Sequence, residues 1–491
     1  MPWPHFSWLC TFFSHDDILI ALIPPSPLSS RPINPTMKPS LFPNRRTFLR
    51  NTAATAGGIF FPNLILGQEG GGKKLNVAGI GGAGGKGASD IGIAAKGANV
   101  VAICDVDRDR LKKAQTLYPD AKMFESFREM FETMGDKIDL CTVSTPDHAH
   151  YPAAMEAIKR GKHVCVQKPL VNRIWEANEL HAAAKKKGVK TNMGNQGHTG
   201  KGIRFLKQWV SEGIVGNVKE IHVWTNRPIW PQGNEAKAKY TPGELPASLN
   251  WESWLAQCPS IPFTNGLHPF AWRGHAEYGA GAMGDMGCHL LDGPFWACGL
   301  GEPYKMEAEC DELTDVSWPK SSHVVCYFKT EKYGEIKLHW YEGSRKPERP
   351  AELEADRDWD KIKGGFILRG DAGVILNTDD YCGSPRLIPS TKMTDFLGGK
   401  SPELKIEQCI AEGEPQLELV RAIEQDKICG SNFDYSVPLT KFCLLGNLAI
   451  ANPGKVINWD SSKQESDNAD ANKLMKRAAV RDGWDYSSEK V

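Results

Sequence analysis

The chain has 491 residues, enough for about three domains of ordinary size. With 41% hydrophobic and 24% charged residues it has the composition of a soluble globular protein. This excludes a disordered chain, a collagen-like repeat and a multi-span membrane protein, so no integral membrane span is expected. Lys and Arg (59) balance Asp and Glu (59), and such a neutral chain is not expected to bind nucleic acid.

The first 72 residues are predicted to lie outside the folded domains. Residues 1–36 mix aromatic, acidic and Pro/Ser-rich stretches, and we expect translation to start at Met37, which makes 1–36 a mis-assigned extension. Residues 44–50 (NRRTFLR) resemble a twin-arginine export signal followed by an apolar Ala/Gly-rich stretch and a glycine-rich linker. This signal over residues 37–72 predicts a periplasmic or otherwise exported protein, and a cytoplasmic one if the signal is not functional.

The thirteen cysteines are scattered and form no C-x-x-C pair or zinc-type cluster, so no metal site is expected. Cys104, Cys141 and Cys165 lie in apolar, strand-like runs, where a free cysteine packs as a small core residue. This usage predicts folding in a reducing compartment. Because twin-arginine export moves folded proteins, it is also compatible with export.

Residues 74–105 read as a strand, a glycine-rich turn, a helix and a second strand. The turn matches G-x-G-x-x-G and comprises Gly79, Ile80, Gly81, Gly82, Ala83 and Gly84. We expect Gly79 to permit the tight turn, Gly81 to let the backbone approach a pyrophosphate, and Gly84 to allow close helix–strand packing. The helix N-terminus would bind phosphates, and Asp105 would accept hydrogen bonds from ribose hydroxyls. The pattern predicts a dinucleotide site that favours NAD, while Arg108 leaves NADP open.

Strands and helices continue to alternate up to residue 198. This predicts a parallel, doubly wound sheet with right-handed crossovers in a domain spanning residues 73–198. Ligands of such sheets bind beyond the carboxyl ends of the strands. The polar residues expected at that edge are Ser144, Thr145, Pro146, Asp147, His150, Gln167, Lys168, Asn195, Gln196 and His198.

Residues 144–170 (STPDHAHYPAAMEAIKRGKHVCVQKPL) resemble the signature of the Gfo/Idh/MocA oxidoreductases. The resemblance extends from about Lys74 to the C-terminus and implies an NAD(P)-dependent enzyme acting on a sugar, inositol or related polyol. It implies that Lys168, in the family's Glu-Lys-Pro motif, lies beside the nicotinamide. Gln167 replaces the glutamate of that motif, which removes a negative charge and is expected to alter the electrostatics or the cofactor contact.

From Val218 the pattern predicts a second domain, spanning 199–491, built on a mostly antiparallel sheet. Strand-like segments fall at 218–225, 304–310, 323–329, 335–341, 365–370 and 373–377, and closing helices at 415–425 and 437–451. The predicted fold is therefore a Rossmann α/β domain followed by an α+β domain with an open sheet. The resemblance implies that this sheet packs against the cofactor domain and makes homo-oligomer contacts.

Residues 279–292 carry the predicted acid–base pair. If this segment is helical from about Met283, Asp285 and His289 lie one turn apart and Asp292 extends the same face. An Asp one turn from a His can orient the ring and stabilise the imidazolium. The segment resembles the family's G-G-x-x-x-D-x-G-x-H-x-x-D motif, which implies that Asp285 and His289 are catalytic and that Asp292 contacts substrate.

Six of the fifteen tryptophans lie between residues 224 and 296. Aromatic faces pack on sugar rings, and a cluster of this kind favours a carbohydrate pocket. The candidate substrate contacts in this stretch are Trp272, Arg273, Tyr278 and His268.

These features predict hydride transfer between a nicotinamide cofactor and a hydroxyl group of a sugar-like substrate. In this hypothesis His289, oriented by Asp285, takes the hydroxyl proton and Lys168 stabilises the developing alkoxide. Two alternatives stay open: an NAD-dependent glycosidase or lyase that oxidises its substrate transiently, and a non-catalytic, cofactor-bound sugar-binding protein.

Overall fold

The computed structural model describes residues 74–487, which lie in one compact unit. The proposed extension (1–36) and the twin-arginine signal (37–72) lie outside the described residues. Among residues 74–487, every helix is too short or too polar to cross a bilayer.

The N-terminal half is built on a six-stranded parallel sheet with the order β3-β2-β1-β4-β5-β6, which confirms the predicted Rossmann fold. Its strands are β1 (Asn76–Ile80), β2 (Asn99–Cys104), β3 (Lys122–Phe124), β4 (Leu140–Val143), β5 (His163–Val166) and β6 (Thr191–Met193). Its helices are α2 (Gly85–Ala94), α3 (Arg108–Leu117), α4 (Phe127–Met134), α5 (Asp147–Lys159) and α6 (Ile174–Lys187). The strand order reverses between β1 and β4, so a ligand crevice is expected beyond their carboxyl ends.

The C-terminal half is built on a nine-stranded sheet with the order β13-β12-β11-β7-β10-β9-β8-β14-β15. The strands are β7 (Val218–Thr225), β8 (Lys305–Asp311), β9 (Ser321–Thr330), β10 (Gly334–Glu342), β11 (Gly364–Gly370), β12 (Val374–Asn377), β13 (Arg386–Ile388), β14 (Ile457–Asp460) and β15 (Glu465–Ser466). β7 and β10 pair in parallel, and the other pairs are antiparallel. The prediction of a mostly antiparallel sheet is confirmed.

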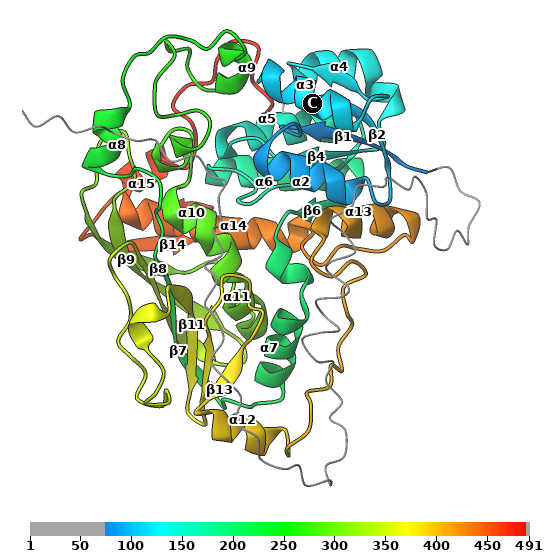
Figure 1. The fold of residues 1–491 in the computed structure, drawn as a ribbon. Coiled ribbons are helices and arrows are strands. Elements are labelled where there is room, and N and C mark those ends of the chain that lie inside the picture. Colours follow the sequence, from blue (N-terminus) through cyan, green and yellow to red (C-terminus); the bar gives the residue numbers. More distant parts are fainter. Residues whose placement is uncertain (1–73, 488–491) are drawn as a thin grey trace, which may run out of the picture. The chain divides into compact units, whose positions relative to one another are not determined.

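The second half also contains helices, one of which joins the two sheets. They are α7 (Lys201–Ser211), α8 (Asn234–Lys239), α9 (Trp251–Leu255), α10 (Gly281–Leu290), α11 (Asp292–Cys298), α12 (Ser390–Phe396), α13 (Pro415–Glu424), α14 (Phe433–Ile450) and α15 (Ala469–Lys473). The long, almost wholly buried α14, orange in Figure 1, packs on α6 and β6 of the first sheet and on β8 and β9 of the second. It therefore fixes the N-terminal half against the C-terminal half.

Helix α13 returns to the N-terminal sheet, which the sequence pattern did not indicate. It packs beside α2 and β6 (Figure 1), and its Leu417 and Val420 share a buried cluster with Val77, Ile91 and Leu140. A Cβ at Gly97 would lie 2.8 Å from Val420 Cγ1, so the turn after α2 is fitted to this helix. Residues of the second half, far downstream in the sequence, thus complete the core of the first domain.

Candidate active site

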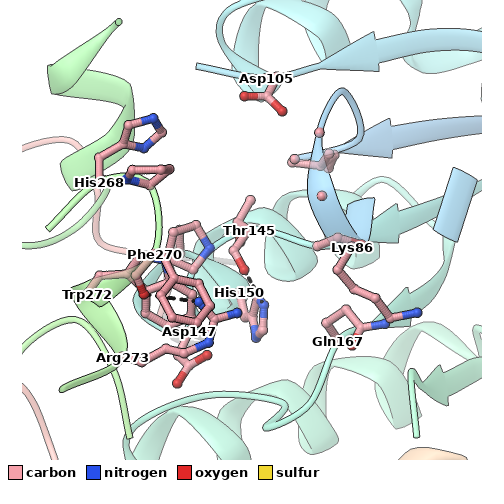
Figure 2. A pocket seen from close by; sticks show the side chains of 18 of the residues that line it. Lys86, Asp105, Thr145, Asp147, His150, Gln167, His268, Phe270, Trp272 and Arg273 are labelled. Carbon is pink, nitrogen blue, oxygen red and sulfur yellow. Dashed lines mark hydrogen bonds between the residues drawn. The ribbon is translucent and has the colours of Figure 1, made fainter. Parts of the chain in front are cut away.

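A cavity of about 640 Å³, a size typical of cofactor and ligand sites, opens at the carboxyl ends of β1, β2, β4 and β5. Figure 2 shows Asp105 at one end and Asp147 with Arg273 at the other. Of the residues singled out from sequence, those that line it are Gly81, Gly84, Asp105, Ser144, Thr145, Pro146, Asp147, His150, Gln167, Lys168, Gln196, His268, Trp272, Arg273, Asp285 and His289. Gly79, Gly82, Ala83, Tyr278 and Asp292 lie outside its lining.

The tight turn belongs to Gly81 and not to Gly79. Gly79 lies inside β1, where a Cβ would approach Ile91 Cδ1 to 3.2 Å. Gly81 has a φ of +71°, which favours glycine, and a Cβ there would lie 2.7 Å from the Ser144 carbonyl oxygen. The amide of Gly81 also donates to the Cys104 carbonyl oxygen at 2.8 Å, which joins the turn to the end of β2.

Close packing of the helix on the turn depends on Gly87, which sequence reasoning missed. A Cβ at Gly87 would stand 1.8 Å from the Gly81 carbonyl oxygen, a distance that no side chain tolerates. At Gly84, to which this role was assigned, a Cβ would meet only the flexible side chain of Arg110. The signal in the sequence was a further glycine three positions after Gly84.

The residues at the end of the cavity formed by the glycine turn and Asp105 fit a bound dinucleotide. Gly85 at the start of α2 lines the cavity, and nothing lies within 4 Å of the position of its Cβ, which leaves space for a phosphate at the helix N-terminus. The hydroxyl of Thr145 is buried, lines the cavity and has no hydrogen-bond partner. Asp105 lines the same cavity; burial raises the pKa of its carboxyl, and backbone N–H groups of Asp107 and Ala83 oppose this shift.

Arg108, considered above as a contact for NADP, is not in the cavity lining. Its guanidinium donates to Glu125 at 2.7 Å and to the Ala247 carbonyl oxygen at 3.0 Å. Arg110 is the arginine that lines the cavity near Asp105. It lies 3.4 Å from Asp107, so its charge is already partly balanced.

At the opposite end Lys168 is bound to Asp285. Its ammonium donates to the carboxylate Oδ1 at 2.8 Å and to the backbone oxygen of the same residue at 2.7 Å. Burial tends to raise the pKa of Asp285, but Lys168 and Arg273, whose Nε lies 3.5 Å away, hold it below its usual value. Asp285 is therefore an anion that orients Lys168. It makes no hydrogen bond to His289, which it was predicted to orient.

Asn195 orients His289 instead. Its amide nitrogen donates to the Cys288 carbonyl oxygen and to Asp292, so its oxygen faces His289 Nδ1 at 2.7 Å. An amide oxygen only accepts, so Nδ1 carries the proton and Nε2 is left with a free lone pair. Burial, followed by the charge of Lys168, lowers the pKa of His289 far below its ordinary value. The ring is thus a neutral base at neutral pH.

Asp292 lies behind this unit and does not reach the cavity. Its carboxylate contacts His198 Nδ1 at 2.9 Å and accepts from the Tyr435 hydroxyl at 2.5 Å and from Asn195 at 3.1 Å. It is almost fully buried. Asp292, predicted to contact substrate, thus lies outside the cavity lining and holds Asn195, which in turn holds His289.

Two buried residues in the first turn of α5, Asp147 and His150, contact the loops around Lys168. Asp147 accepts from the Ala280 amide at 3.0 Å; burial raises its pKa to about 7, against the opposing charges of Arg273 and Lys168. His150 lies 2.8 Å from the Pro169 carbonyl oxygen and 2.9 Å from that of Thr145. Burial lowers the pKa of His150 to about 4, so this ring is neutral and donates from one nitrogen only.

The segment 226–280 covers the cavity, and half of the tryptophan cluster lines it. Trp230, Trp254 and Trp272 are in the lining, whereas Trp224, Trp251 and Trp296 pack elsewhere. Phe270, Trp272 and Arg273 form one wall, facing Lys86 and Gln167 across the pocket in Figure 2. The Arg273 guanidinium lies 4.3 Å from the Trp272 ring centre. Tyr278, predicted to contact substrate, is instead buried against His148 and Trp254.

The cover is held to the cofactor domain by segments that no local motif marks. The amide of Asn250 donates to the Val106 carbonyl oxygen at 2.8 Å, which fixes the cover beside the end of β2. From the C-terminal tail, Trp484 also lines the cavity, and the Arg128 guanidinium lies 3.8 Å above its ring. Two stretches remote from the glycine turn thus contribute to the lining of the cavity.

Comparison with protein-family models finds matches in two stretches of the chain. Residues 73–195 match the NAD-binding Rossmann fold of the Gfo/Idh/MocA oxidoreductase family, and residues 199–317 match that family's C-terminal alpha/beta domain.

Individual relatives are distant. The chain is 24% identical over 272 residues to scyllo-inositol 2-dehydrogenase (NADP(+)) IolW of Bacillus subtilis, covering 55% of this chain and 63% of that protein. It is 28% identical over 204 residues to a glycosyl hydrolase family 109 protein of Saccharopolyspora erythraea, covering 36% and 44%. The matches thus span about half the length of these relatives. The WlbA dehydrogenase of Bordetella pertussis, solved with NADH and UDP-GlcNAcA, shares the fold at a TM-score of 0.56 and 16% identity, covering 79% of this chain and 99% of that one.

Proposed function

The chain carries both domains of the Gfo/Idh/MocA oxidoreductase family, and we propose that it transfers a hydride between NAD(P) and a hydroxyl-bearing carbon of a sugar, inositol or related polyol. The observation that carries this proposal is the pairing of a neutral His289 with the cation of Lys168 in one cavity. That cavity is also lined by the glycine turn and Asp105. A base and a cation at the reaction end are what removal of a hydroxyl proton needs.

In the oxidative direction, His289 Nε2 takes the proton of the substrate hydroxyl. Lys168 donates to the same oxygen and stabilises the negative charge that develops on it. Asp285 holds the ammonium in place, and Asn195 holds the imidazole with Nε2 unprotonated. When bound, the nicotinamide supplies the hydride acceptor.

Two measurements on purified protein test the proposal. Mass spectrometry of the released small molecules should detect NAD or NADP, and a panel of sugars and polyols should change absorbance at 340 nm. Absence of both cofactor binding and hydride transfer would refute it. Binding of cofactor and a sugar with no hydride transfer in any substrate would instead support a cofactor-bound binding protein.

A second candidate is glycoside cleavage through transient oxidation, elimination and re-reduction. It is favoured by the similarity to proteins named glycosyl hydrolase family 109, including one from Solibacter usitatus at 33% identity over 139 residues. Incubation with aryl glycosides without an added acceptor separates the two. Released aglycone with no net NADH supports cleavage, whereas net NADH formation supports the dehydrogenase.

We also propose that the protein is exported by the twin-arginine route and forms homo-oligomers. Residues 44–50, NRRTFLR, support export. Cell fractionation of the wild type and of a variant with Arg45→Lys and Arg46→Lys tests it. The wild type should be exported and the variant should stay in the cytoplasm; recovery of both from the cytoplasm counts against export. Light scattering of the purified protein tests the oligomer, and a monomer mass would exclude it.

A further inference from the structure

Asp90, on the buried face of α2, is a charged residue that the proposed mechanism leaves without a role. Its carboxylate is fully buried and does not itself line the cavity. An isolated charge in such a place is strongly unfavourable unless several donors satisfy it.

Four side chains donate to this carboxylate, two to each oxygen. Lys86 Nζ and Gln416 Nε2 donate to Oδ1 at 2.6 and 2.8 Å. Ser144 Oγ and Gln167 Nε2 donate to Oδ2 at 2.7 and 2.8 Å. Burial raises the pKa of Asp90, and the charge of Lys86 opposes that rise. The carboxylate is saturated with hydrogen bonds and paired with one cation.

Three of the four donors line the cavity, and each comes from a different element. Lys86 lies in the first turn of α2, Ser144 follows β4, and Gln167 follows β5 directly before Lys168. Only Gln416, on α13, lies outside the lining. One carboxylate thus ties together the ends of two strands and the start of the phosphate-facing helix.

The hydrogen bonds to Asp90 also fix which atoms of its partners face the cavity. Only the nitrogen of the Gln167 amide can donate to Asp90, so its oxygen is turned away from that carboxylate and is free to accept from a ligand. Lys86 is held next to the loop that follows β6: with its amide oxygen toward Lys86, Gln196 accepts from Nζ at 3.0 Å. The adjacent Asn195 orients His289.

We infer that Asp90 is a positioning residue for the reaction end of the cofactor cavity. It supplies from α2 the negative charge that Gln167 lacks, and it holds Lys86, Ser144 and Gln167 as one unit against the bound cofactor. This inference rests on the proposed function.

The test exchanges the charge between two positions. Gln167→Glu places a second carboxylate 2.8 Å from the position of Asp90 Oδ2, where two anions cannot both ionise. Asp90→Asn leaves Lys86 without its buried counter-charge. In the double variant the carboxylate at 167 accepts from the amide at 90, so one charge and one hydrogen bond are restored.

Each single variant should weaken NADH binding, measured by fluorescence titration, at least about tenfold, and lower kcat by a similar factor. The double variant should recover to within about threefold of the wild type for both quantities. Multiplicative losses in the double variant would overturn the inference, because they would show that the two positions act independently.

Gln416→Met is the matched control, since it removes a donor to the same carboxylate from outside the cavity. It should lower the melting temperature and leave the dissociation constant of NADH and kcat unchanged within about threefold. If it weakens NADH binding as much as Asp90→Asn, the role of Asp90 is structural and the inference fails. Wild-type protein that binds no NADH would refute the proposed function, whereas unaltered binding and kcat in Asp90→Asn would refute only this inference.

Discussion

The two ends of the cavity are built in different ways. Most of the cofactor end comes from one continuous stretch, from β1 through the glycine turn and α2 to Asp105, with Thr145 added from the loop after β4. The reaction end combines side chains from at least five separate segments, among them Lys168, Asn195, Arg273 and His289. A continuous stretch is visible as a spacing pattern in the sequence, whereas an assembled site depends on contacts that only the fold brings about.

This difference explains where sequence reasoning succeeded. The residues after β4 and β5 line the cavity because parallel strands end at one edge, which is a rule of the fold. The partners of Asp285 and His289 were assigned from their spacing on a helix. In the structure each has a closer partner from another segment, Lys168 and Asn195.

The largest expected effect falls at the reaction end. His289→Ala removes the base and Lys168→Ala the cation, and each should lower kcat by about 10²–10⁴-fold while NADH still binds. Steady-state rates at 340 nm and a fluorescence titration measure the two quantities. Near-wild-type rates in both variants would show that the chemistry lies elsewhere in the cavity.

At the cofactor end the expected effect is smaller and changes affinity. Asp105→Ala removes an anionic acceptor, and a charged hydrogen bond contributes about 1.5–3 kcal/mol, so NAD binding should weaken about tenfold or more. The preference should move toward NADP, since the negative charge beside the ribose is lost. Asp109→Ala, a largely exposed residue of the neighbouring helix, is the control and should bind NAD as the wild type does.

Substitutions at two glycines of the turn distinguish an effect on packing from an effect on cofactor binding. Gly87→Ala forces a Cβ to within 1.8 Å of the Gly81 carbonyl oxygen, so we expect a loss of about 1–3 kcal/mol of stability. Gly85 lines the cavity and no protein atom lies within 4 Å of the position of its Cβ, but its φ of +52° is strained for alanine. Gly85→Ala should therefore cost about 1–2 kcal/mol of stability and also weaken NAD binding. Unchanged NAD binding would mean that Gly85 does not face the cofactor.

What could not be foreseen shares one physical cause. The packing of α13 on the first domain, the place of Trp484 and the Asp90 network all depend on contacts between residues far apart in the sequence. Asp292 has the spacing of a substrate contact, yet the packing of His198 and Tyr435 against it places it behind the site. A motif identifies residue types, and the packing decides which of their atoms reach the cavity.

The smallest expected effect concerns pH. The pKa of Asp147 is raised to about 7 by burial, so the folded state favours the protonated carboxyl. The unfolded chain ionises near pH 3.8, so stability contributed by this group falls as the pH rises toward 7 and is lost above it. Between pH 6 and 8 the wild type should lose about 1 kcal/mol from this source.

Asp147→Asn should remove that part of the pH dependence, as measured by denaturant unfolding at both pH values. Glu342, whose pKa burial also raises to about 7, lies in β10 away from the cavity. Glu342→Gln should flatten the same window without changing KM, whereas Asp147→Asn should change KM as well, because Asp147 lines the cavity near Arg273 and Lys168. An unchanged KM in Asp147→Asn would show that Asp147 affects only stability, although it lines the reaction end of the cavity.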